Sequence, residues 1–305
     1  MVNQSKSQYL DTKWFKKFFT WPLEGAVAWV VVNTLKLLPI DIASGLMGFI
    51  ARNLGPHLSV SNRARINIRN CFPEWTESRI KNVLRDMWEN CGRIIGEYPH
   101  IQNLDVSGND KRVEVIGVEH IESMRDDELP GIVFSAHIGN WELLPMLAEP
   151  NGLRMNFVYR ALNSPLAEKV LRKAHGRLSP YLIPKSREGA IKMARVLKDG
   201  GHLAIMIDQK LNEGITIPFF GRPAKTTTAL AAFALRHRCP IIPARVERIA
   251  GATFRVIFYP PIQLPNSGDT VRDTELIMRN ANQIIENWIR DTPSQWLWLH
   301  RRWGK

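Results

Sequence analysis

The apolar and polar positions of the first hundred residues follow a helical period. A nearly unbroken apolar stretch covers residues 22–39, and an amphipathic pattern continues over residues 41–104. Within that second part, Thr76 stands just before an apolar-periodic segment, where its hydroxyl suits the N-cap of a helix. The pattern therefore predicts a helical front end.

The apolar stretch is short for a membrane span. Between Pro22 and Pro39 lie 16 residues, which as a helix span roughly 24 Å, less than the hydrocarbon core of a bilayer. Residues 13–21 mix lysines with aromatic side chains, and no small-residue cleavage site follows. Basic residues flank the stretch on both sides, so they give no orientation. We expect a membrane-directed helix that spans the bilayer or lies in its interface; a core helix of a soluble protein is the alternative.

From about residue 112 the pattern changes to short apolar runs that alternate with amphipathic segments. Such alternation predicts an α/β fold, a mixed and mostly parallel sheet flanked by helices. There is no internal repeat or long linker, so we expect a membrane-associated helical segment at residues 1–54 and one α/β domain at residues 55–305. The expected strands cover residues 112–116, 131–136, 154–160, 202–207, 241–248 and 253–259. The expected helices cover residues 140–149, 165–178, 187–198, 226–237 and 273–291.

Charge and aromatic content narrow the range of partners. The formal charge is +12 and the pI about 9.8, which favours nucleic acid, phospholipid or an acidic carrier. No nucleic-acid recognition module is present, so nucleic acid is the weakest of these. Several of the ten Trp lie near the two ends of the chain, a distribution typical of proteins that meet a membrane interface. Cys71, Cys91 and Cys239 are far apart and indicate neither a disulfide framework nor a metal site.

Candidate chemistry lies in residues 131–145, GIVFSAHIGNWELLP. His137 ends an apolar strand, at the edge where α/β sheets bind ligands. Glu142 is five positions further on, so the two side chains meet only if His137 lies on a turn and Glu142 in the first turn of the next helix. Gly139 permits such a turn, and Asn140 is a suitable N-cap. An imidazole takes a proton from a hydroxyl while a carboxylate fixes its tautomer, so the pair suits general-base catalysis.

The spacing alone does not identify the pair. His100 and Asp105 have the same spacing, but no predicted strand leads into His100. Ser135 shares a strand face with His137, without the surroundings of a nucleophile elbow. From the residues alone, a hydrogen-bonded structural histidine stays open as the alternative for His137.

Several blocks of the sequence resemble those of one family. The blocks are NIRNCFPEWTESR, FSAHIGNWELLP, VYRALNSP, MIDQKLNEGITIPFFGRPAKTTTALA and the ending PSQWLWLHRRWGK. In this order they resemble the late lipid A acyltransferases of Gram-negative bacteria, within the wider group of glycerolipid acyltransferases that carry a His-x4-acid motif. Glu142 stands where many acyltransferases have Asp. The block IPFFGRPA replaces the Phe-Pro-Glu-Gly element of the glycerol-phosphate acyltransferases.

The resemblance implies a glycerolipid acyltransferase-like fold and an enzyme on the cytoplasmic face of the bacterial inner membrane, in contact with its lipids. Such an enzyme moves a fatty acyl chain from acyl carrier protein to a hydroxyl of a lipid A precursor, with no cofactor and no metal. His137 is then the base and Glu142 orients it. Arg160 is the candidate donor to the oxyanion, with the backbone N–H groups around Gly139 as the second option.

Other residues of the matching blocks are candidates for binding substrate. One is the N-cap after His137, and two end another predicted strand. Three combine a turn, a cation and a hydroxyl suited to a phosphate or phosphopantetheine, and two lie among C-terminal tryptophans suited to lipid headgroups. A turn cap, a structural turn and a basic tail without partners are the respective alternatives. In sequence order the candidates are Asn140, Asp208, Gln209, Gly221, Arg222, Thr226, Arg301 and Arg302.

Two rival functions share these features. An acyltransferase that acts on another glycolipid or on an amino-acid lipid has the same motifs, because the acceptor pocket does not show in the sequence. A non-catalytic basic membrane-binding protein is the rival of a different class, and in it His137 and Glu142 are dispensable. The acyl-chain length, the acyl chain of the acceptor that is modified and the oligomeric state do not follow from these residues.

Overall fold

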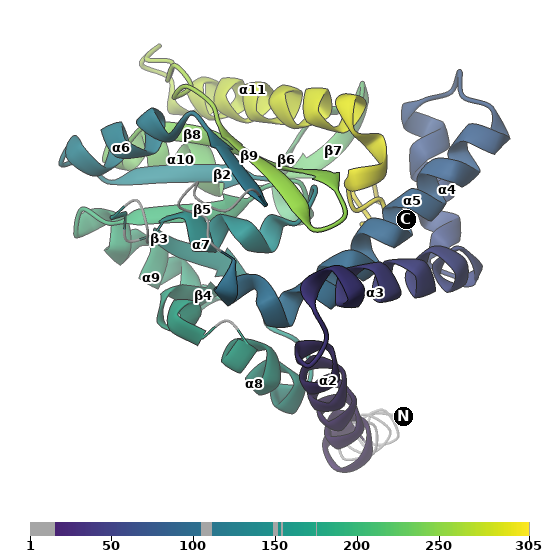
Figure 1. Cartoon of the computed structure of the whole chain (residues 1–305). Helices are drawn as coiled ribbons and strands as arrows, with labels where there is room; N and C mark the ends of the chain where they lie inside the picture. Colours follow the sequence, from purple (N-terminus) through teal and green to yellow (C-terminus); the bar gives the residue numbers. More distant parts are fainter. Residues whose placement is uncertain (1–15, 105–111, 149–151, 154, 175, 305) are drawn as a thin grey trace, which may run out of the picture.

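The computed structural model describes residues 16–104, 112–148, 152–153, 155–174 and 176–304. A sheet of seven strands forms its centre, with helices on both faces and the N-terminal helices to one side (Figure 1). The strand order is β1-β9-β8-β2-β5-β3-β4. The strands are β1 (Val113–Ile116), β2 (Gly131–Ser135), β3 (Met155–Tyr159), β4 (Leu182–Pro184), β5 (His202–Met206), β8 (Ile241–Ala250) and β9 (Thr253–Phe258).

The predicted fold class is confirmed. Within this sheet β8 and β9 pair antiparallel, and the other neighbouring strands pair in parallel. The six strands expected from the sequence are present, while β4 and the separate hairpin β6 (Lys210–Phe219) and β7 (Arg222–Thr226) escaped prediction. At the hairpin turn, Phe220 and Gly221 have φ of 53° and 66°, as a two-residue turn with both central residues in the left-handed region requires.

The register of the central strands positions the candidate site. Ser135 at the end of β2 pairs with Met206 at the end of β5. The residues that follow, His137 and Asp208, therefore leave the sheet at the same edge, where the carboxyl ends of parallel strands meet.

Helices cover both faces of the sheet. Ile132 and Phe134 of β2 belong to the core that includes α10 and α11, whereas Val133 points to the opposite core, which includes α6 and α7. The helix expected at residues 140–149 is a 3-10 turn, η4 (Trp141–Leu143), continued by α7. The longer helices of this part are α6 (Val118–Asp126), α7 (Leu144–Ala148), α8 (Pro165–Ala174), α9 (Arg187–Lys198), α10 (Ala229–His237) and α11 (Thr270–Asp291), with the 3-10 turns η5 (Gly176–Tyr181) and η6 (Pro293–Gln295).

The front end is helical, as predicted. Thr76 caps α5 by accepting a hydrogen bond from the N–H of Arg79 at 3.3 Å. The helix expected over residues 22–39 ends at Lys36, and Pro39, in an extended conformation, precedes the next helix. The elements are η1 (Lys16–Thr20), α2 (Trp21–Lys36), α3 (Ile40–Leu54), η2 (Gly55–His57), α4 (Ser61–Cys71), α5 (Glu77–Glu97) and η3 (Tyr98–Asn103).

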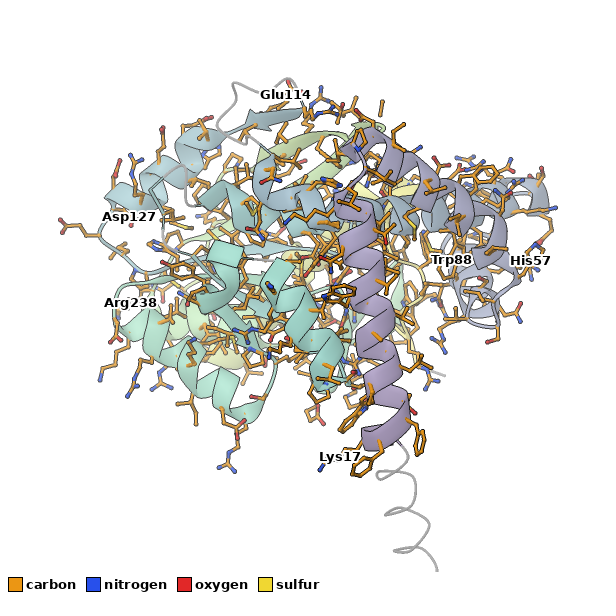
Figure 2. The ribbon with its side chains drawn as sticks, turned by 60° about the horizontal axis from the view of Figure 1, so that its bottom comes forward. Lys17, His57, Trp88, Glu114, Asp127 and Arg238 are labelled. Carbon is orange, nitrogen blue, oxygen red and sulfur yellow. The ribbon has the colours of Figure 1, made fainter. Side chains whose placement is uncertain are left out.

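The two N-terminal helices keep large apolar side chains at the surface. Figure 2 shows α2 across the front of the molecule, with Lys17 at its outer end. None of the helices in the described ranges is long and apolar enough to cross a membrane, so the spanning form of the predicted helix is not supported. The exposed apolar side chains of this region are Phe18, Phe19, Leu23, Val27, Trp29, Val30, Leu37, Ile42, Leu46, Phe49, Ile50, Leu54 and Leu58.

Two glycines allow α3 to lie directly on α5. A Cβ built at Gly92 would overlap the carbonyl oxygen of Met47, and one built at Gly96 would overlap that of Ala43. Both clashes are with backbone, which cannot turn aside as a flexible side chain can. These glycines therefore set the distance between the two helices.

Substitution of Gly96 by Ala is expected to destabilise the protein, because α3 must move away from α5. We expect a loss of about 1–3 kcal/mol in the free energy of unfolding, measured by thermal or denaturant unfolding in detergent. Gly45 is the matched control, since a Cβ there meets nothing within 4 Å. Gly45→Ala should instead raise stability by up to about 1 kcal/mol through helix propensity. Equal effects of the two substitutions would contradict the close helix approach.

Candidate active site

The candidate site lies on the turn that follows β2. His137 stands two residues after the end of the strand. Gly139 has a φ of 61°, and a Cβ there would overlap a backbone carbonyl oxygen of β8, so this position requires glycine. Asn140 then caps η4, its Oδ1 accepting a hydrogen bond from the N–H of Glu142 at 3.2 Å. The predicted turn and N-cap are confirmed.

A buried carboxylate from the neighbouring strand holds the imidazole. Asp208 Oδ1 lies 2.8 Å from His137 Nδ1, and the backbone N–H of His137 donates to Asp208 Oδ2 at 3.0 Å. From the resemblance, Glu142 was expected to orient the imidazole. The partner of Nδ1 is instead Asp208, because Asp208 leaves β5 beside His137 while Glu142 lies beyond the turn on η4.

The C-terminal segment clamps the same turn. Trp296 donates its indole N–H to Asp208 Oδ2 at 2.8 Å and forms an isolated β-bridge with Ile138. Leu297 donates its N–H to the carbonyl of His137 at 3.0 Å, and Gly139 donates its N–H to the carbonyl of Gln295 at 3.1 Å. The C-terminal segment therefore behaves as a short strand that fixes both the imidazole-bearing residue and the carboxylate.

The other face of the imidazole meets an amide and a second imidazole. Gln209 Nε2 lies 3.3 Å from His137 Nε2 and 3.5 Å from His300 Nε2. The ring centroids of His300 and Trp141 lie 5.0 Å and 5.1 Å from that of His137, both in edge-to-face orientation. Only 17% of the His137 side chain is exposed, so its orientation is closely defined.

The electrostatics favour a charged pair of His137 and Asp208. Burial alone lowers the pKa of His137, but the charge and hydrogen bond of Asp208, then the charge of Glu142, raise it above its ordinary value. Burial raises the pKa of Asp208, yet the charge and hydrogen bond of His137 lower it well below the ordinary value of a carboxyl. Burial lowers the pKa of His300 to about 4, with the charge of Asp208 opposing and that of His137 assisting, so His300 is neutral.

An apolar cavity of about 350 Å³ opens beside the imidazole. Its walls come from the ends of β2, β3 and β5 and from α8, and its lining is mainly apolar, with His137 among its polar members. Such a hollow suits a long apolar ligand whose polar end meets the histidine. Side chains that represent its apolar wall are Val133, Phe157, Leu171, Leu182 and Ala204.

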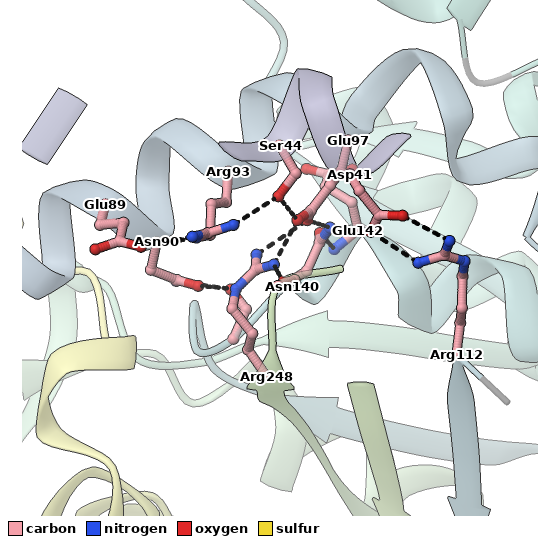
Figure 3. A network of polar contacts seen from close by, with 12 residues as sticks. Asp41, Ser44, Glu89, Asn90, Arg93, Glu97, Arg112, Asn140, Glu142 and Arg248 are labelled. Atoms are coloured by element: carbon pink, nitrogen blue, oxygen red, sulfur yellow. Dashed lines mark hydrogen bonds and ion pairs between the residues drawn. The ribbon is translucent and has the colours of Figure 1, made fainter. Parts of the chain in front are cut away.

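A second buried carboxylate, from the N-terminal helices, supports the same turn (Figure 3). Glu97 of α5 is fully buried and pairs with both terminal nitrogens of Arg248. It also accepts hydrogen bonds from Asn140 Nδ2 at 2.7 Å and from the hydroxyl of Ser44 on α3 at 2.6 Å. Asn90 adds a bond from Nδ2 to the carbonyl of Gly139 at 3.0 Å. The turn after β2 and α3 therefore share one buried partner.

Five of the predicted site residues surround one cavity. Four of them, together with His137, line the cavity directly or hold the imidazole. Arg160 is exposed at the mouth, and Glu142 is half-buried, accepting a hydrogen bond from the Trp141 indole at 3.0 Å. The five are His137, Glu142, Arg160, Asp208 and Gln209.

The other candidates lie elsewhere or are engaged in structure. Both ends of the Asn140 amide are used, one for the cap and one for Glu97. Arg302 is fully buried and donates to the hydroxyl of Thr226 at 2.8 Å and to the carbonyl of Lys225 at 2.8 Å. The predicted exposure of Arg302 to lipid phosphates is therefore wrong.

The remaining predictions concern the hairpin and the chain end. Gly221 lies on the β6–β7 turn and Arg222 begins β7, both outside the lining of the cavity, and the Arg222 guanidinium lies 4.9 Å from the ring centroid of Trp303. Arg301 is exposed. Trp296 and Trp298 are fully buried, which contradicts the interfacial position expected for them.

The second His-x4-acid match does not form part of this site. His100 lies on η3 with its Nε2 3.0 Å from the carbonyl oxygen of Leu35. Its proposed partner, residue 105, falls outside the described residues. His100 is thus engaged with α2 and does not bond to the residues that hold His137.

Four residues that shape the site, namely Glu97, Gln295, Trp296 and His300, were not predicted from the sequence. Trp296, His300 and Gln295 belong to a segment whose Trp and Arg content indicated a membrane interface, and Glu97 ended an ordinary amphipathic helix. No signal in the sequence indicated these four. By contrast, Asp208 and Gln209 follow a predicted strand, and that position placed both at the correct edge of the sheet.

One set among the described residues has the spacing of a metal site. Ligand atoms of His137, Asp208 and His300 all lie within 4.8 Å of one another. Asp208 already accepts three N–H groups, and one of them belongs to the imidazole that a metal would need. The arrangement therefore fits a hydrogen-bonded His–Asp pair better than a metal cage.

Comparison with known proteins identifies relatives along nearly the whole chain. A family model described as bacterial lipid A biosynthesis acyltransferase matches residues 13–305. The lipid A biosynthesis lauroyltransferase of Escherichia coli (strain K12) is 26% identical over 298 residues, covering 93% of this chain and 91% of its own length. A lipid A biosynthesis acyltransferase of Haemophilus influenzae is 24% identical over 242 residues, covering 78% of this chain and 73% of its own.

More distant similarities extend beyond lipid A enzymes. The phosphatidylinositol mannoside acyltransferase of Mycolicibacterium smegmatis is 21% identical over 295 residues, covering 91% of this chain and 90% of its own. Among solved structures, the 1-acyl-sn-glycerophosphate acyltransferase PlsC of Thermotoga maritima matches 91% of this chain and 99% of its own, with 13% identity and a TM-score of 0.35.

Removal of the Glu97 carboxylate is expected to destabilise the protein, because the network that supports the turn after β2 loses its central acceptor. Glu97→Ala leaves the Arg248 guanidinium, 8% exposed, without its charge partner, and such a loss costs about 3–5 kcal/mol. Unfolding in denaturant should show this decrease in the free energy of unfolding. Glu275→Ala is the control, because Glu275 pairs with Arg279 on the surface of α11, where the expected change is below about 0.5 kcal/mol. A loss at Glu97 as small as at Glu275 would contradict the role given to this network.

Proposed function

The chain belongs to the bacterial lipid A biosynthesis acyltransferase family, and from this membership we propose that it moves a fatty acyl chain from acyl carrier protein to a hydroxyl of a lipid A precursor. The reaction is a late, secondary acylation in lipopolysaccharide biosynthesis. The observation that carries the proposal is the His137–Asp208 pair at the mouth of an apolar cavity.

His137 acts as the general base. Its Nδ1 is taken by Asp208 at 2.8 Å, so the neutral imidazole carries its lone pair on Nε2, the nitrogen that faces Gln209 and the cavity. The acceptor hydroxyl gives its proton to Nε2 as its oxygen attacks the thioester carbonyl carbon. The imidazolium so formed is stabilised by the Asp208 carboxylate and then protonates the departing thiolate.

Glu142 assists through its charge. The two ring nitrogens of His137 have Asp208 and Gln209 as neighbours, while the negative charge of Glu142 adds to the upward shift in the pKa of His137. In this scheme Glu142 stabilises the imidazolium formed in the reaction, and Asp208 fixes the tautomer.

The cavity accommodates the acyl chain. Its wall is mainly apolar and includes His137, which suits a ligand with a long hydrocarbon tail and a thioester head. Arg160 and Lys185, both exposed residues in the cavity lining, offer positive charge to an acidic carrier or to its phosphopantetheine phosphate. The donor brings an activated carbonyl, so the scheme requires no cofactor.

The outer sides of α2 and α3 hold the enzyme at the cytoplasmic face of the inner membrane. Exposed aromatic and aliphatic side chains on both helices, Trp29 and Phe49 among them, supply apolar area, and Lys17 and Lys36 are exposed beside them. Apolar area together with basic charge suits the surface of an anionic bilayer without a span. The net charge of +12 fits the same surface, the acidic carrier and the lipid A phosphates.

A second acceptor class has one specific observation in its favour. The match to the phosphatidylinositol mannoside acyltransferase covers 91% of this chain. The name of that relative indicates that its acceptor is a mannosylated phosphoinositide and not a lipid A precursor. An acyltransferase of another glycolipid therefore remains the second candidate. Family membership disfavours the non-catalytic membrane-binding protein.

Acyl transfer by the purified protein tests the function directly. Acyl carrier protein loaded with a fatty acid is the donor, a Kdo-bearing tetra-acylated lipid A precursor is the acceptor, and mass spectrometry detects the product. His137→Ala should lower the rate by at least ~100-fold, as expected for the loss of a general base. His100→Ala, the spacing-matched control, should retain the activity. Product formed only with a mannosyl lipid as acceptor would favour the second candidate, and equal activity of all three proteins would remove His137 from the mechanism.

The rate is expected to rise with pH at a midpoint set by His137. A base must be neutral, and the pKa of His137 is raised mainly by Asp208, so the acid limb should lie above the ordinary imidazole value of about 6.5. In Asp208→Asn the carboxylate charge is lost, so the limb should move to lower pH while kcat falls by ~10²–10⁴. Glu275→Gln, a surface carboxylate, should leave both unchanged. An acid limb that stays in place in Asp208→Asn would contradict this electrostatic coupling.

A further inference from the structure

The side-chain amide of Gln209 lies between two imidazoles. Its Nε2 is 3.3 Å from Nε2 of His137 and 3.5 Å from Nε2 of His300. Gln209 follows Asp208 directly after β5, so the residue that fixes the base and the residue that faces its free nitrogen are neighbours in the chain. A carboxamide nitrogen carries two hydrogens, one for each ring nitrogen.

Both imidazoles accept such a bond when His137 is in the neutral form that acts as base. Nδ1 of His137 is engaged with Asp208 at 2.8 Å, which leaves the lone pair of the neutral ring on Nε2. His300 is kept neutral by burial, with a pKa of about 4, so its Nε2 also accepts when Nδ1 holds the proton. This network assigns the nitrogen, and not the oxygen, of the Gln209 amide to the side of the rings.

Substrate binding must break the hydrogen bond between the Gln209 amide and His137 Nε2. The hydroxyl that His137 activates has to lie within about 2.6–3.2 Å of its Nε2, which is where the amide N–H now points. When the hydroxyl takes that place, Gln209 retains its bond to His300 and presents its other N–H beside the carbon under attack. A donor held in this way needs no reorganisation as charge develops.

The alternative donors near the turn are engaged or exposed. The backbone N–H groups of His137, Ile138 and Gly139 donate to Asp208 Oδ2, to the carbonyl of Ala136 and to the carbonyl of Gln295 respectively. The second option of the sequence analysis, the N–H groups around Gly139, therefore has no free donor among these three. Arg160, the first option, is an exposed residue of the cavity mouth.

A second polar group shows that the cavity is built to hold a ligand oxygen. Ser135 lines the same cavity, and its hydroxyl is buried with no hydrogen-bond partner among the described residues. Buried hydroxyls without a partner are uncommon. A ligand with a polar head in this cavity supplies the missing partner.

We propose that Gln209 is the donor that stabilises the oxyanion of the tetrahedral intermediate, with His300 as its anchor; this rests on the proposed acyl transfer. As the acceptor oxygen bonds to the thioester carbonyl carbon, its proton passes to His137 Nε2 and the carbonyl π pair moves to the oxygen, which accepts the Gln209 N–H. The oxygen then re-forms the carbonyl, the C–S bond breaks, and the thiolate takes the proton from His137. The two substrates and His137 account for every atom and electron.

Binding of an oxyanion mimic tests this step without turnover. The probes are a long-chain alkyl trifluoromethyl ketone and the methyl ketone of equal chain length, titrated into the full-length protein in detergent micelles. The fluorinated ketone adds water to form a tetrahedral diol, and His137 can take the proton of one of its hydroxyls to leave an oxyanion. Wild type should prefer the fluorinated ketone. In Gln209→Ala that preference should fall at least ~10-fold while the affinity for the methyl ketone stays within ~3-fold, because the donor acts on the charged form.

Kinetics supply the second readout. Gln209→Ala should lower kcat by ~10²–10³ with the KM for the acyl thioester within ~3-fold of wild type. Gln209→Glu places a carboxylate beside His137 and should in addition move the acid limb of the rate profile to higher pH. Gln283→Ala is the matched control: it removes the same group from an exposed position on α11, where Gln283 Nε2 donates to Asn287 Oδ1 at 3.1 Å.

The outcomes separate the donor role from the reaction. If Gln209→Ala keeps the ketone preference, or wild type shows none, the donor role of Gln209 is overturned whether or not acyl transfer occurs. If the preference is lost in Gln209→Ala but wild type acylates no lipid acceptor, the donor role holds and the proposed function fails. A fall in thermal stability with equal changes in kcat and KM would assign Gln209 to structure alone.

Discussion

The buried carboxylate of Asp208 is the constraint on which the site depends. It accepts three N–H groups: the imidazole and the backbone of His137, and the indole of Trp296. A buried carboxylate without partners costs several kcal/mol, so its burial is tolerable only while all three donors are in place. One side chain thus joins the end of β2, the end of β5 and the C-terminal segment, and none of the three is fixed without the others.

Glu97 repeats this arrangement on the opposite side of the turn. Asp208 holds the imidazole, and Glu97 holds the cap residue Asn140 while pairing with Arg248 and Ser44. Since Ser44 lies on α3, the helix with the exposed apolar side is joined to the turn after β2 through one buried side chain. Movement of α3 therefore acts on the support of that turn.

Local signals in the sequence were sufficient for the fold class and for one half of the site. The strand before His137, the glycine turn and the Asn140 cap each depend on neighbours within a few residues, and each was predicted. The partner of His137 depends on strand register, which places Asp208 71 positions away beside it. No short-range pattern encodes that pairing, and the acid favoured from the sequence was the nearer one.

The prediction for the C-terminal tryptophans was wrong for another reason. An amphipathic aromatic side chain has the same sequence signature at a membrane interface and in a core. Arg302, which is buried against Thr226, fails in the same way, since charge predicts exposure unless a buried partner is known.

The His-x4-acid spacing acquires its meaning from this geometry. A residue five positions after the histidine is past the turn and capped by Asn140, so it cannot displace the strand-borne carboxylate from Nδ1. It still stands in the lining of the same cavity, where a second negative charge raises the pKa of His137 and favours the imidazolium that the reaction forms. While the His137 ring is neutral, the negative charges of Asp208 and Glu142 repel each other. Both carboxylates are stabilised once the ring takes a proton. In the proposed proton transfer, the short motif therefore contributes to the charge state of the ring, while the distant Asp208 fixes its tautomer and contributes more to the raised pKa.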